Sequence, residues 1–295
     1  MRSVIVLLLA CLAVINAAKV KIMSFNIDCR VCDLKHENGA NWDERVQNEL
    51  DTIARHDPDI IGMQEPMFRL DVKQLTPKGY KAIYFDKADW LPWGVYPDAT
   101  ILYKEARFVQ KDFNMFWLGP NSSFPAGFDR LALPRLAVYS LFEDRLDKTQ
   151  FYFGTTHFDH GDDLEGSNVD CTASAKELLE FTAPVAAKYP FLWTGDFNSQ
   201  TNNNNAYSIL TNTSAAVHLE DSYFASPTHT IFSNLDPLPA YDYGHSIDHI
   251  FYANNHDVAS YVPQDWAVDM YVYGDKQQYA SDHFAIVSTI DIKQR

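Results

Sequence analysis

Hydrophobic and polar positions alternate along the chain in short segments, and most apolar runs end at a cluster of polar residues. The stretch "KVKIMSFNI" (19–27) places apolar Val20 and Ile22 at every second position, which predicts a strand. The stretch "DIIGMQE" (59–65) predicts a second short strand that ends at Glu65. Runs of the same kind predict further strands at 81–85, 99–103, 136–142, 151–156, 191–194, 246–252 and 284–290.

One segment has the period of an amphipathic helix. In "NWDERVQNELDTIARHDP" (41–58), the apolar residues Val46, Leu50 and Ile53 fall on one face. Asn41 is suited to cap the first turn, and Pro58 ends the helix. A second helix is predicted at 173–188. Strands therefore outnumber helices, which favours an α+β fold or a layered α/β sandwich.

The first 17 residues are typical of a secretory signal peptide. Arg2 precedes an apolar run that is too short to span a bilayer, and small residues follow it, which places cleavage near Ala17. No second apolar run long enough to cross a membrane follows, so we expect a secreted protein without a transmembrane segment. Because there is no internal repeat or Gly/Ser linker, residues 18–295 are expected to form one domain.

Composition agrees with a folded, acidic protein. Hydrophobic residues make up 46% of the 295 positions, which is ample for a core and argues against global disorder. The net charge of −15 repels polyanions at long range, and there is no run of Lys and Arg to follow a phosphate backbone. These features disfavour a tight, non-specific nucleic-acid binder. They do not exclude nucleic acid as a substrate, since a bound divalent cation offsets local charge.

The cysteines left after signal cleavage are Cys29, Cys32 and Cys171. Three is an odd number for an oxidising compartment, so we expect one pair and one free thiol, or an intermolecular bond. A structural zinc site would need a fourth ligand and more regular spacing. Sequons at Asn121 and Asn212 are candidate glycosylation sites.

Candidate catalytic residues gather where the predicted strands end. In "LWTGDFNSQ", an apolar run stops at Asp196 and Asn198, and alternate positions of an extended segment point the same way. Turn chemistry alone accounts for such a pair, and a similar structural explanation exists for each polar residue by itself. Asp248 is the exception, because an acid among apolar strand residues costs stability unless it is paired, and a histidine is the natural partner. Taken together, the polar residues at the strand ends provide the oxygens and imidazoles that a metal-assisted hydrolase needs. These residues are Asn26, Glu65, His157, Asp196, Asn198, Asp248, Asp282 and His283.

In chain order, the motifs "SFN", "MQE", "TTHFDH", "GDFN", "SIDHIF" and "SDHF" resemble the signature of the endonuclease/exonuclease/phosphatase superfamily, whose members include deoxyribonuclease I. The resemblance extends from Asn26 to His283. It implies a four-layered α/β sandwich, in which two packed mixed β-sheets are flanked by helices and the site lies at one end of the sheets.

The resemblance also implies a role for each matching residue. Glu65, Asn26 and Asp282 would hold Mg²⁺ or Mn²⁺. Asp196 would activate the attacking water. Asn198 would hold the scissile phosphate, and Arg135, in the segment "FWLGPNSSFPAGFDRLALPRLAVYSLF", would be a further phosphate contact. His157 and His283, the latter oriented by Asp248, would stabilise the transition state. Asp28 is a further candidate cation ligand.

The expected function is a secreted Mg²⁺-dependent phosphoesterase that acts on phosphodiesters as a nuclease, with no stable protein partner. Two substrate alternatives remain, a sphingomyelinase-like lipid phosphodiesterase and an inositol phosphate phosphatase, and a non-catalytic binding protein on the same scaffold is a third. An acidic stretch, "GDDLEGSNVDCTASAKELL", stands where many relatives carry an arginine, and it disfavours long polyanions. Trp90 and Trp93 either contact the substrate or a lipid interface, or pack under the sheet edge. A zinc β-lactamase site is set aside because Thr155 replaces the first histidine of its motif.

Overall fold

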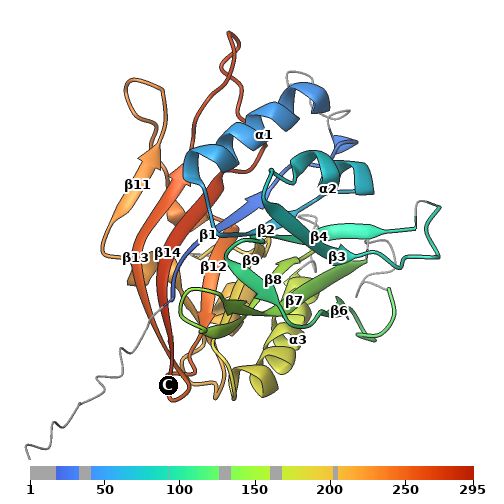
Figure 1. The fold of residues 1–295 in the computed structure, drawn as a ribbon, viewed down its shortest axis with the longest axis vertical. Helices are drawn as coiled ribbons and strands as arrows, with labels where there is room; N and C mark the ends of the chain where they lie inside the picture. The colour runs from blue at the N-terminus through green and yellow to red at the C-terminus, as the bar shows by residue number, and fades with distance from the viewer. Residues whose placement is uncertain (1–17, 33–40, 93, 126–133, 160–167, 202–204) are drawn as a thin grey trace, which may run out of the picture.

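The structure is a computed structural model, and it describes residues 18–32, 41–92, 94–125, 134–159, 168–201 and 205–295. The expected signal peptide (1–17), Trp93 and part of the acidic stretch lie outside these residues. Two mixed β-sheets pack face to face (Figure 1).

The first sheet contains both ends of the described chain. Its strands lie in the order β11 (His229–Phe232), β13 (Ala259–Asp269), β14 (Ala285–Gln294), β1 (Ala18–Asn26), β2 (Ile60–Gln64), β4 (Tyr96–Lys104) and β3 (Tyr80–Phe85). β1 runs parallel to β2 and antiparallel to β14, so the sheet is mixed.

The second sheet supplies the remaining strands. The order is β10 (Leu219–Asp221), β12 (Asp248–Ala253), β9 (Phe191–Asp196), β8 (Gln150–His157), β7 (Arg135–Asp144) and β5 (Phe108–Gln110), and β6 (Asn114–Leu118) also pairs with β7. β8 and β9 are parallel, whereas β12 and β9 are antiparallel.

Helices cover the outer faces of both sheets. The helices are α1 (Trp42–His56), α2 (Arg69–Leu75), α3 (Asn168–Ala186), α4 (Asn205–Leu210), the short α5 (Ser222–Ala225) and the 3₁₀ turn η2 (Tyr243–His245). Figure 1 shows α1 and α2 on one side of the sheets and α3 on the other. Three buried apolar clusters fill the spaces between these layers: one between the sheets, one under α1 with Ile53 and Met23, and one under α3 with Leu178 and Trp193. The predicted four-layered sandwich is confirmed.

The helix predicted at 41–58 forms as α1. The side chain of Asn41 accepts a hydrogen bond from the backbone N–H of Glu44, as expected of an N-cap. The helix ends at His56, where Asp57 takes a left-handed conformation with φ 45° and its N–H caps the carbonyl of Ile53.

Several boundaries differ from the prediction. α3 begins at Asn168 and not at 173, and α4 begins at Asn205 inside a stretch that reads as a polar loop. β12 begins two residues later than predicted, because η2 occupies the approach to it. The sequence pattern also misses β13, whose alternation is interrupted by a bulge between Pro263 and Asp265.

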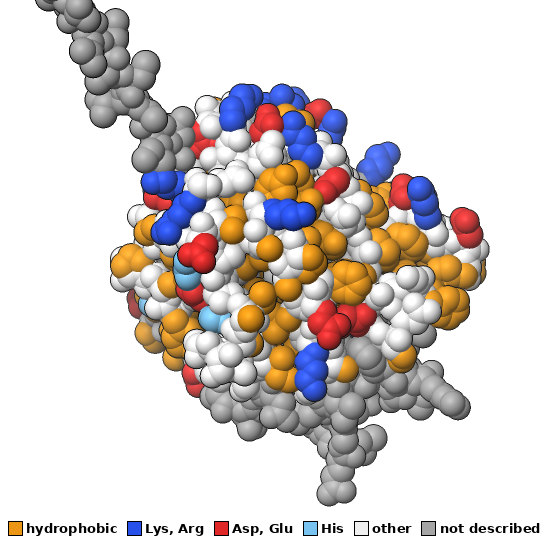
Figure 2. Space-filling view, turned by 90° about the horizontal axis from the view of Figure 1, so that it is seen from below, with side chains coloured by type: hydrophobic (Ala, Val, Ile, Leu, Met, Phe, Trp, Pro, Cys, Tyr) orange, Lys and Arg blue, Asp and Glu red, His pale blue; other side chains and the backbone are white. Residues whose placement is uncertain are grey.

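Cys29 and Cys32 form a disulfide, and Cys171 keeps its thiol, which donates to the carbonyl of Asp159 at 2.9 Å. The expected pair with one remaining thiol is therefore found. In the described part of the chain, no helix is both long and apolar enough to cross a bilayer. On the face seen in Figure 2, basic side chains lie among acidic and apolar ones and form no continuous basic strip.

Candidate active site

Strand register brings the predicted site residues together at one end of both sheets. In the second sheet, His157 of β8 and Asp248 of β12 both pair with Asp196, the last residue of β9. In the first sheet, Asn26 at the end of β1 pairs with Gln64, and Glu65 follows directly. The amide Nδ2 of Asn26 donates to Asp196 Oδ2 at 3.0 Å and so joins the two sheets at the site.

Asp196 lies between two histidines. Its Oδ2 is 3.5 Å from Nε2 of His157 and 3.6 Å from Nε2 of His283. Burial opposes ionisation of Asp196, but the charges of His283 and His157 outweigh it and lower the pKa of this carboxyl below the ordinary 3.8. Asp196 is therefore an anion at neutral pH, as a base that accepts a proton from water must be.

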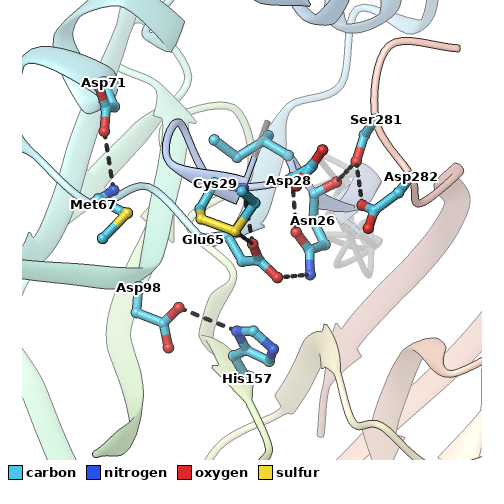
Figure 3. Close-up of a disulfide and its surroundings, with 12 residues drawn as sticks. Asn26, Asp28, Cys29, Glu65, Met67, Asp71, Asp98, His157, Ser281 and Asp282 are labelled. Atoms are coloured by element: carbon cyan, nitrogen blue, oxygen red, sulfur yellow. Dashed lines mark hydrogen bonds and ion pairs between the residues drawn. A yellow bond between two sulfur atoms is a disulfide. The ribbon is translucent and has the colours of Figure 1, made fainter. Parts of the chain in front are cut away.

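Each of these histidines is oriented by a second carboxylate. Nδ1 of His283 lies 2.8 Å from Oδ2 of Asp248, which matches the expected pair. Nδ1 of His157 lies 3.1 Å from Oδ1 of Asp98, on β4 of the opposite sheet (Figure 3). The two pairs leave both Nε2 atoms facing the same acid.

Asp98 is a site residue that the sequence reasoning missed. The signal was available, because Asp98 enters the apolar run 99–103 much as Asp248 enters its own strand. Burial disfavours its charge, but His157 and Arg135 lower its pKa to about 2. Asp98 thus stays ionised and holds the His157 ring.

The imidazoles favour the protonated form. Burial lowers the pKa of His283, but Asp248 and Asp196 raise it well above the ordinary 6.5. For His157, burial and Arg135 lower the pKa, and Asp98 and Asp196 outweigh them and raise it. Both side chains are therefore placed to donate a proton or a hydrogen bond at Nε2.

Glu65 lies beside Asn26 on the first-sheet side of the site. Its Oε1 accepts from Asn26 Nδ2 at 2.8 Å, and its Oε2 accepts from the backbone N–H of Cys29 at 2.8 Å (Figure 3). An oxygen of Glu65 lies within 4.8 Å of one atom each of His157 and Asp196. Glu65 has φ 76° and Asn198 has φ 46°, which is sparsely populated for residues other than glycine and is typical of functional sites.

Asp282 lies at the edge of the site. Its Oδ1 is 3.3 Å from Ser281 Oγ, which donates to the carbonyl of Asn26 at 2.8 Å (Figure 3). The carboxylate is exposed, and among the described residues it does not join the close group of Glu65, His157 and Asp196. Asp28 is buried and lies 3.8 Å from Arg45, and its backbone N–H donates to Asn26.

Two predicted phosphate contacts have partners within the protein. Asn198 Nδ2 donates to the carbonyl of Phe158 at 3.0 Å, which leaves its second N–H available. Arg135 is buried, with Nη1 3.1 Å from Asp98 Oδ2 and 2.8 Å from Nδ1 of His157. Because a guanidinium only donates, that nitrogen of His157 bonds Asp98 when protonated and Arg135 when not. Phosphate binding by Asn198 and Arg135 stays a prediction.

Trp90 is partly packed and partly exposed. Trp90 lies 5.8 Å from Tyr96 and 6.0 Å from Trp117 between ring centroids, yet 47% of its surface is exposed. Tyr96 donates to the carbonyl of Pro134, the residue before Arg135. Trp90 is therefore packed beside Tyr96 and Trp117 and keeps part of its ring accessible.

Comparison with known proteins agrees with this arrangement. Residues 23–283 match the Endonuclease/Exonuclease/phosphatase family. The chain belongs to that family. Members of this family are hydrolytic phosphoesterases and generally depend on a divalent metal.

Relatives of known structure share the fold over nearly the whole chain. An endonuclease/exonuclease/phosphatase family protein from Bacteroides thetaiotaomicron has a TM-score of 0.76 at 23% identity, covering 94% of this chain and 98% of its own. A mannosyl-6-phosphatase from Bacteroides thetaiotaomicron VPI-5482 has a TM-score of 0.74 at 23% identity, covering 92% of this chain and 99% of its own.

A curated relative matches in sequence. Protein angel of Drosophila melanogaster is 27% identical over 192 residues, which are 61% of this chain and 52% of that protein. The chain thus matches about half the length of this curated relative.

The residues present fit a hard divalent cation. Glu65 and Asp196 provide carboxylate oxygens close together, and the amide Nδ2 of Asn26 donates to both, while its Oδ1, the oxygen that could bind a cation, accepts the N–H of Asp28. Such ligands suit Mg²⁺ or Mn²⁺. The sulfurs of Cys29 and Cys32 lie near Glu65, but their disulfide removes the thiolates that a zinc site would require.

Proposed function

We propose that this protein is a secreted Mg²⁺-dependent phosphodiesterase of the nuclease type. The observation that carries the proposal is the convergence of two imidazole–carboxylate pairs on Asp196, with Glu65 and Asn26 alongside. Hydrolysis of an anionic phosphodiester needs an activated water, donors for the developing charge and a cation. Each requirement has a residue of the right chemistry in one place.

Glu65 and Asn26, with Asp282 at the rim, would hold Mg²⁺. The bound cation supplies neutralisation of the phosphate charge and polarisation of the phosphorus–oxygen bonds. Among the described side chains of the site, Glu65 is the strongest candidate for this role, because its carboxylate is half-buried and is oriented by two hydrogen bonds.

The protein's own groups divide the remaining work. Asp196, ionised and fixed by the N–H of Asn198 at 2.9 Å, accepts the proton of the attacking water. His283 and His157 donate from Nε2 to the phosphoryl and leaving oxygens. The carboxylates of Asp248 and Asp98 hold the rings and stabilise their charged forms.

A phosphomonoesterase is the second candidate. The net charge of −15 and the scattered positions of Lys and Arg along the sequence favour a short anionic substrate over a long polynucleotide. The mannosyl-6-phosphatase with the same fold illustrates that activity on a related scaffold. The exposed Trp90, in contrast, suits stacking on a nucleobase and favours the nuclease-type activity.

The purified protein should be incubated in parallel with single-stranded RNA, duplex DNA, sphingomyelin vesicles, inositol phosphates and sugar phosphates. Hydrolysis of RNA or DNA, absent from an Asp196→Ala control, supports the proposal. Hydrolysis of phosphomonoesters alone would replace it with the second candidate, and release from sphingomyelin alone would make the protein a lipid phosphodiesterase. No hydrolysis of any substrate would favour a binding protein.

Cation dependence is tested separately. EDTA should abolish hydrolysis, and Mg²⁺ or Mn²⁺ in excess should restore it. Activity that persists after exhaustive chelation would refute the metal-dependent part of the proposal.

Secretion rests on residues 1–17. Expression in a eukaryotic secretory system should release a protein whose N-terminal sequence begins near Ala18, and glycosidase treatment should reduce its mass if Asn121 or Asn212 is modified. Retention of residues 1–17 in the mature protein would contradict secretion through this segment.

A further inference from the structure

The turn that follows β1 holds one of the carboxylate oxygens of Glu65 (Figure 3). The backbone N–H of Cys29 donates to Oε2 at 2.8 Å, and Sγ of Cys32 lies 3.8 Å from the same oxygen. Because that sulfur is in the disulfide, it carries no proton and supplies a packing contact only. The opposite oxygen, Oε1, is held by Asn26. The turn therefore fixes the position of Oε2, one of the two carboxylate oxygens of Glu65.

The backbone of this turn is unusual and requires outside restraint. Asp28 has φ 52°, a left-handed conformation that a non-glycine residue adopts at a cost. Immediately after it, the disulfide joins Cys29 to Cys32 with a Cα–Cα distance of 5.0 Å. The N–H of Cys32 donates to the carbonyl of Cys29 at 2.8 Å, which closes the turn.

The other anchors of the turn lie on either side of the Cys29 N–H. Arg45 of α1 donates to the carbonyls of Ile27 and Asp28 at 2.6 and 2.7 Å, which fixes the chain before Cys29. Arg30 donates to Asp71 of α2 at 2.8 Å and fixes the turn to the segment after Glu65. The disulfide is the covalent restraint that includes Cys29 itself.

We propose that the Cys29–Cys32 disulfide positions Glu65 for the divalent cation, so that cation affinity depends on this bond. The inference rests on the proposed function, because it takes Glu65 as a cation ligand. The two cysteines act through the N–H that orients Glu65, and they are positioning residues. Loss of a group that hydrogen-bonds to a metal ligand and orients it typically lowers metal affinity about 10–100-fold.

The direct test is Mn²⁺ binding by calorimetry to the full mature chain and to its Cys29→Ser/Cys32→Ser variant. We expect the dissociation constant for Mn²⁺ to rise about 10–100-fold in the variant. Cys171→Ser, which keeps the disulfide and removes the remaining thiol, is the matched control and should bind Mn²⁺ as the wild type does. Cooperative thermal unfolding without Mn²⁺ checks that each variant is folded.

A kinetic readout separates positioning from general loosening of the structure. In the Cys29→Ser/Cys32→Ser variant, the Mn²⁺ concentration for half-maximal hydrolysis should rise, and the rate at saturating Mn²⁺ should stay close to that of the wild type. A fall in the saturating rate with unchanged Mn²⁺ dependence would overturn the proposal.

Reversible reduction of the wild type covers the case in which the double variant does not fold. The protein is reduced, desalted and titrated with Mn²⁺, then re-oxidised and titrated again. Affinity should fall on reduction and return on re-oxidation. Unchanged affinity in a wild type that binds Mn²⁺ and hydrolyses phosphoesters would overturn the role of the disulfide alone. A wild type that neither binds Mn²⁺ nor responds to EDTA would overturn the metal-dependent function as well.

Discussion

The described part of the chain contains buried and half-buried histidine–aspartate pairs of two kinds, and comparing them shows what distinguishes the site. Two pairs meet at Asp196, and two others lie elsewhere in the fold. All four use the same side chains at similar distances: His157–Asp98, His283–Asp248, His56–Asp269 and His249–Asp221.

The pairs outside the site are held by contacts within the scaffold. His249 bonds the carbonyl of Ser199 through Nε2 at 2.9 Å and lies 2.9 Å from the hydroxyl of Tyr243 through Nδ1. Asp221 accepts from the hydroxyls of Tyr207 and Tyr243. His56 shares Asp269 with Arg55 and packs edge-on against Phe232. These pairs satisfy buried groups and stabilise the fold.

The pairs at the site differ at the second ring nitrogen. Nε2 of His157 and of His283 faces the carboxylate of Asp196 at 3.5 and 3.6 Å, longer than a normal hydrogen bond. Two imidazoles, each held at Nδ1 by its own carboxylate, therefore face the carboxylate of Asp196. The lesson is that a buried histidine–aspartate pair indicates catalysis only when the far nitrogen is turned toward a reacting group.

The largest effect should come from the acid at the centre. Asp196→Ala removes the group that accepts the proton of water, so kcat should fall by about 10⁴-fold, the upper range for general base catalysis. Thermal unfolding should show a folded protein. Near-normal turnover by this variant would remove Asp196 from the mechanism and make the site pairs no different from the structural ones.

Asp98→Asn should give a smaller loss. The amide no longer stabilises a charged His157 and can select the wrong tautomer, so kcat should fall by about 10²-fold, within the usual range for acid–base catalysis. Steady-state kinetics of Asp98→Asn and of Asp248→Asn would show whether the two pairs contribute equally. An unaffected Asp98→Asn would place this pair with the structural ones.

Asp269→Ala should act on stability and spare catalysis. It leaves the buried His56 and the half-buried Arg55 without their carboxylate partner, so the free energy of unfolding should fall by about 3 kcal/mol, as when one partner of a buried pair is removed. Urea denaturation measures this loss, and kcat of the folded variant should stay close to that of the wild type, because the partners of Asp269 are Arg55, His56 and the backbone of Tyr271. A large loss of kcat without a loss of stability would show that the His56–Asp269 pair takes part in catalysis, as the pairs at the site do.

The pH dependence should show the smallest effect. Asp196 must be ionised, and its pKa is lowered from 3.8, so the acidic limb of kcat/KM should lie below that pH. His283 must be protonated, and its pKa is raised above 6.5, so the basic limb should lie above that pH. Asp248→Asn removes the main group that raises it, and the basic limb should move down toward 6.5. A profile that Asp248→Asn leaves in place would show that His283 is not the proton donor.

Much of the fold and site was predictable because the chemistry sits in continuous motifs. The alternation of 19–27 and the apolar run of 59–65 indicated β1 and β2, and the parallel pairing of these strands brings Asn26 next to Glu65. The isolated acid Asp248 indicated a histidine partner, and the structure supplies His283.

Other features could not be predicted, because they depend on tertiary contacts or on a local interruption of the strand pattern. Asp98 joins His157 across the two sheets, 59 residues away in sequence. β13 is interrupted by Pro263 and a bulge, so its period is lost locally although β14 pairs with it along its length. The bond between Cys29 and Cys32 was one of the open pairings, and only the turn geometry shows that it contacts Glu65.

Anomalous diffraction from crystals of the protein soaked in Mn²⁺ tests the central claim most directly. The claim is that Glu65, Asp196 and the two histidine pairs form a single hydrolytic centre. We predict a Mn²⁺ peak bound to Glu65, which disappears in Glu65→Gln. A Mn²⁺ ion bound elsewhere, in a protein that still hydrolyses its substrate in a Mn²⁺-dependent manner, would contradict the account.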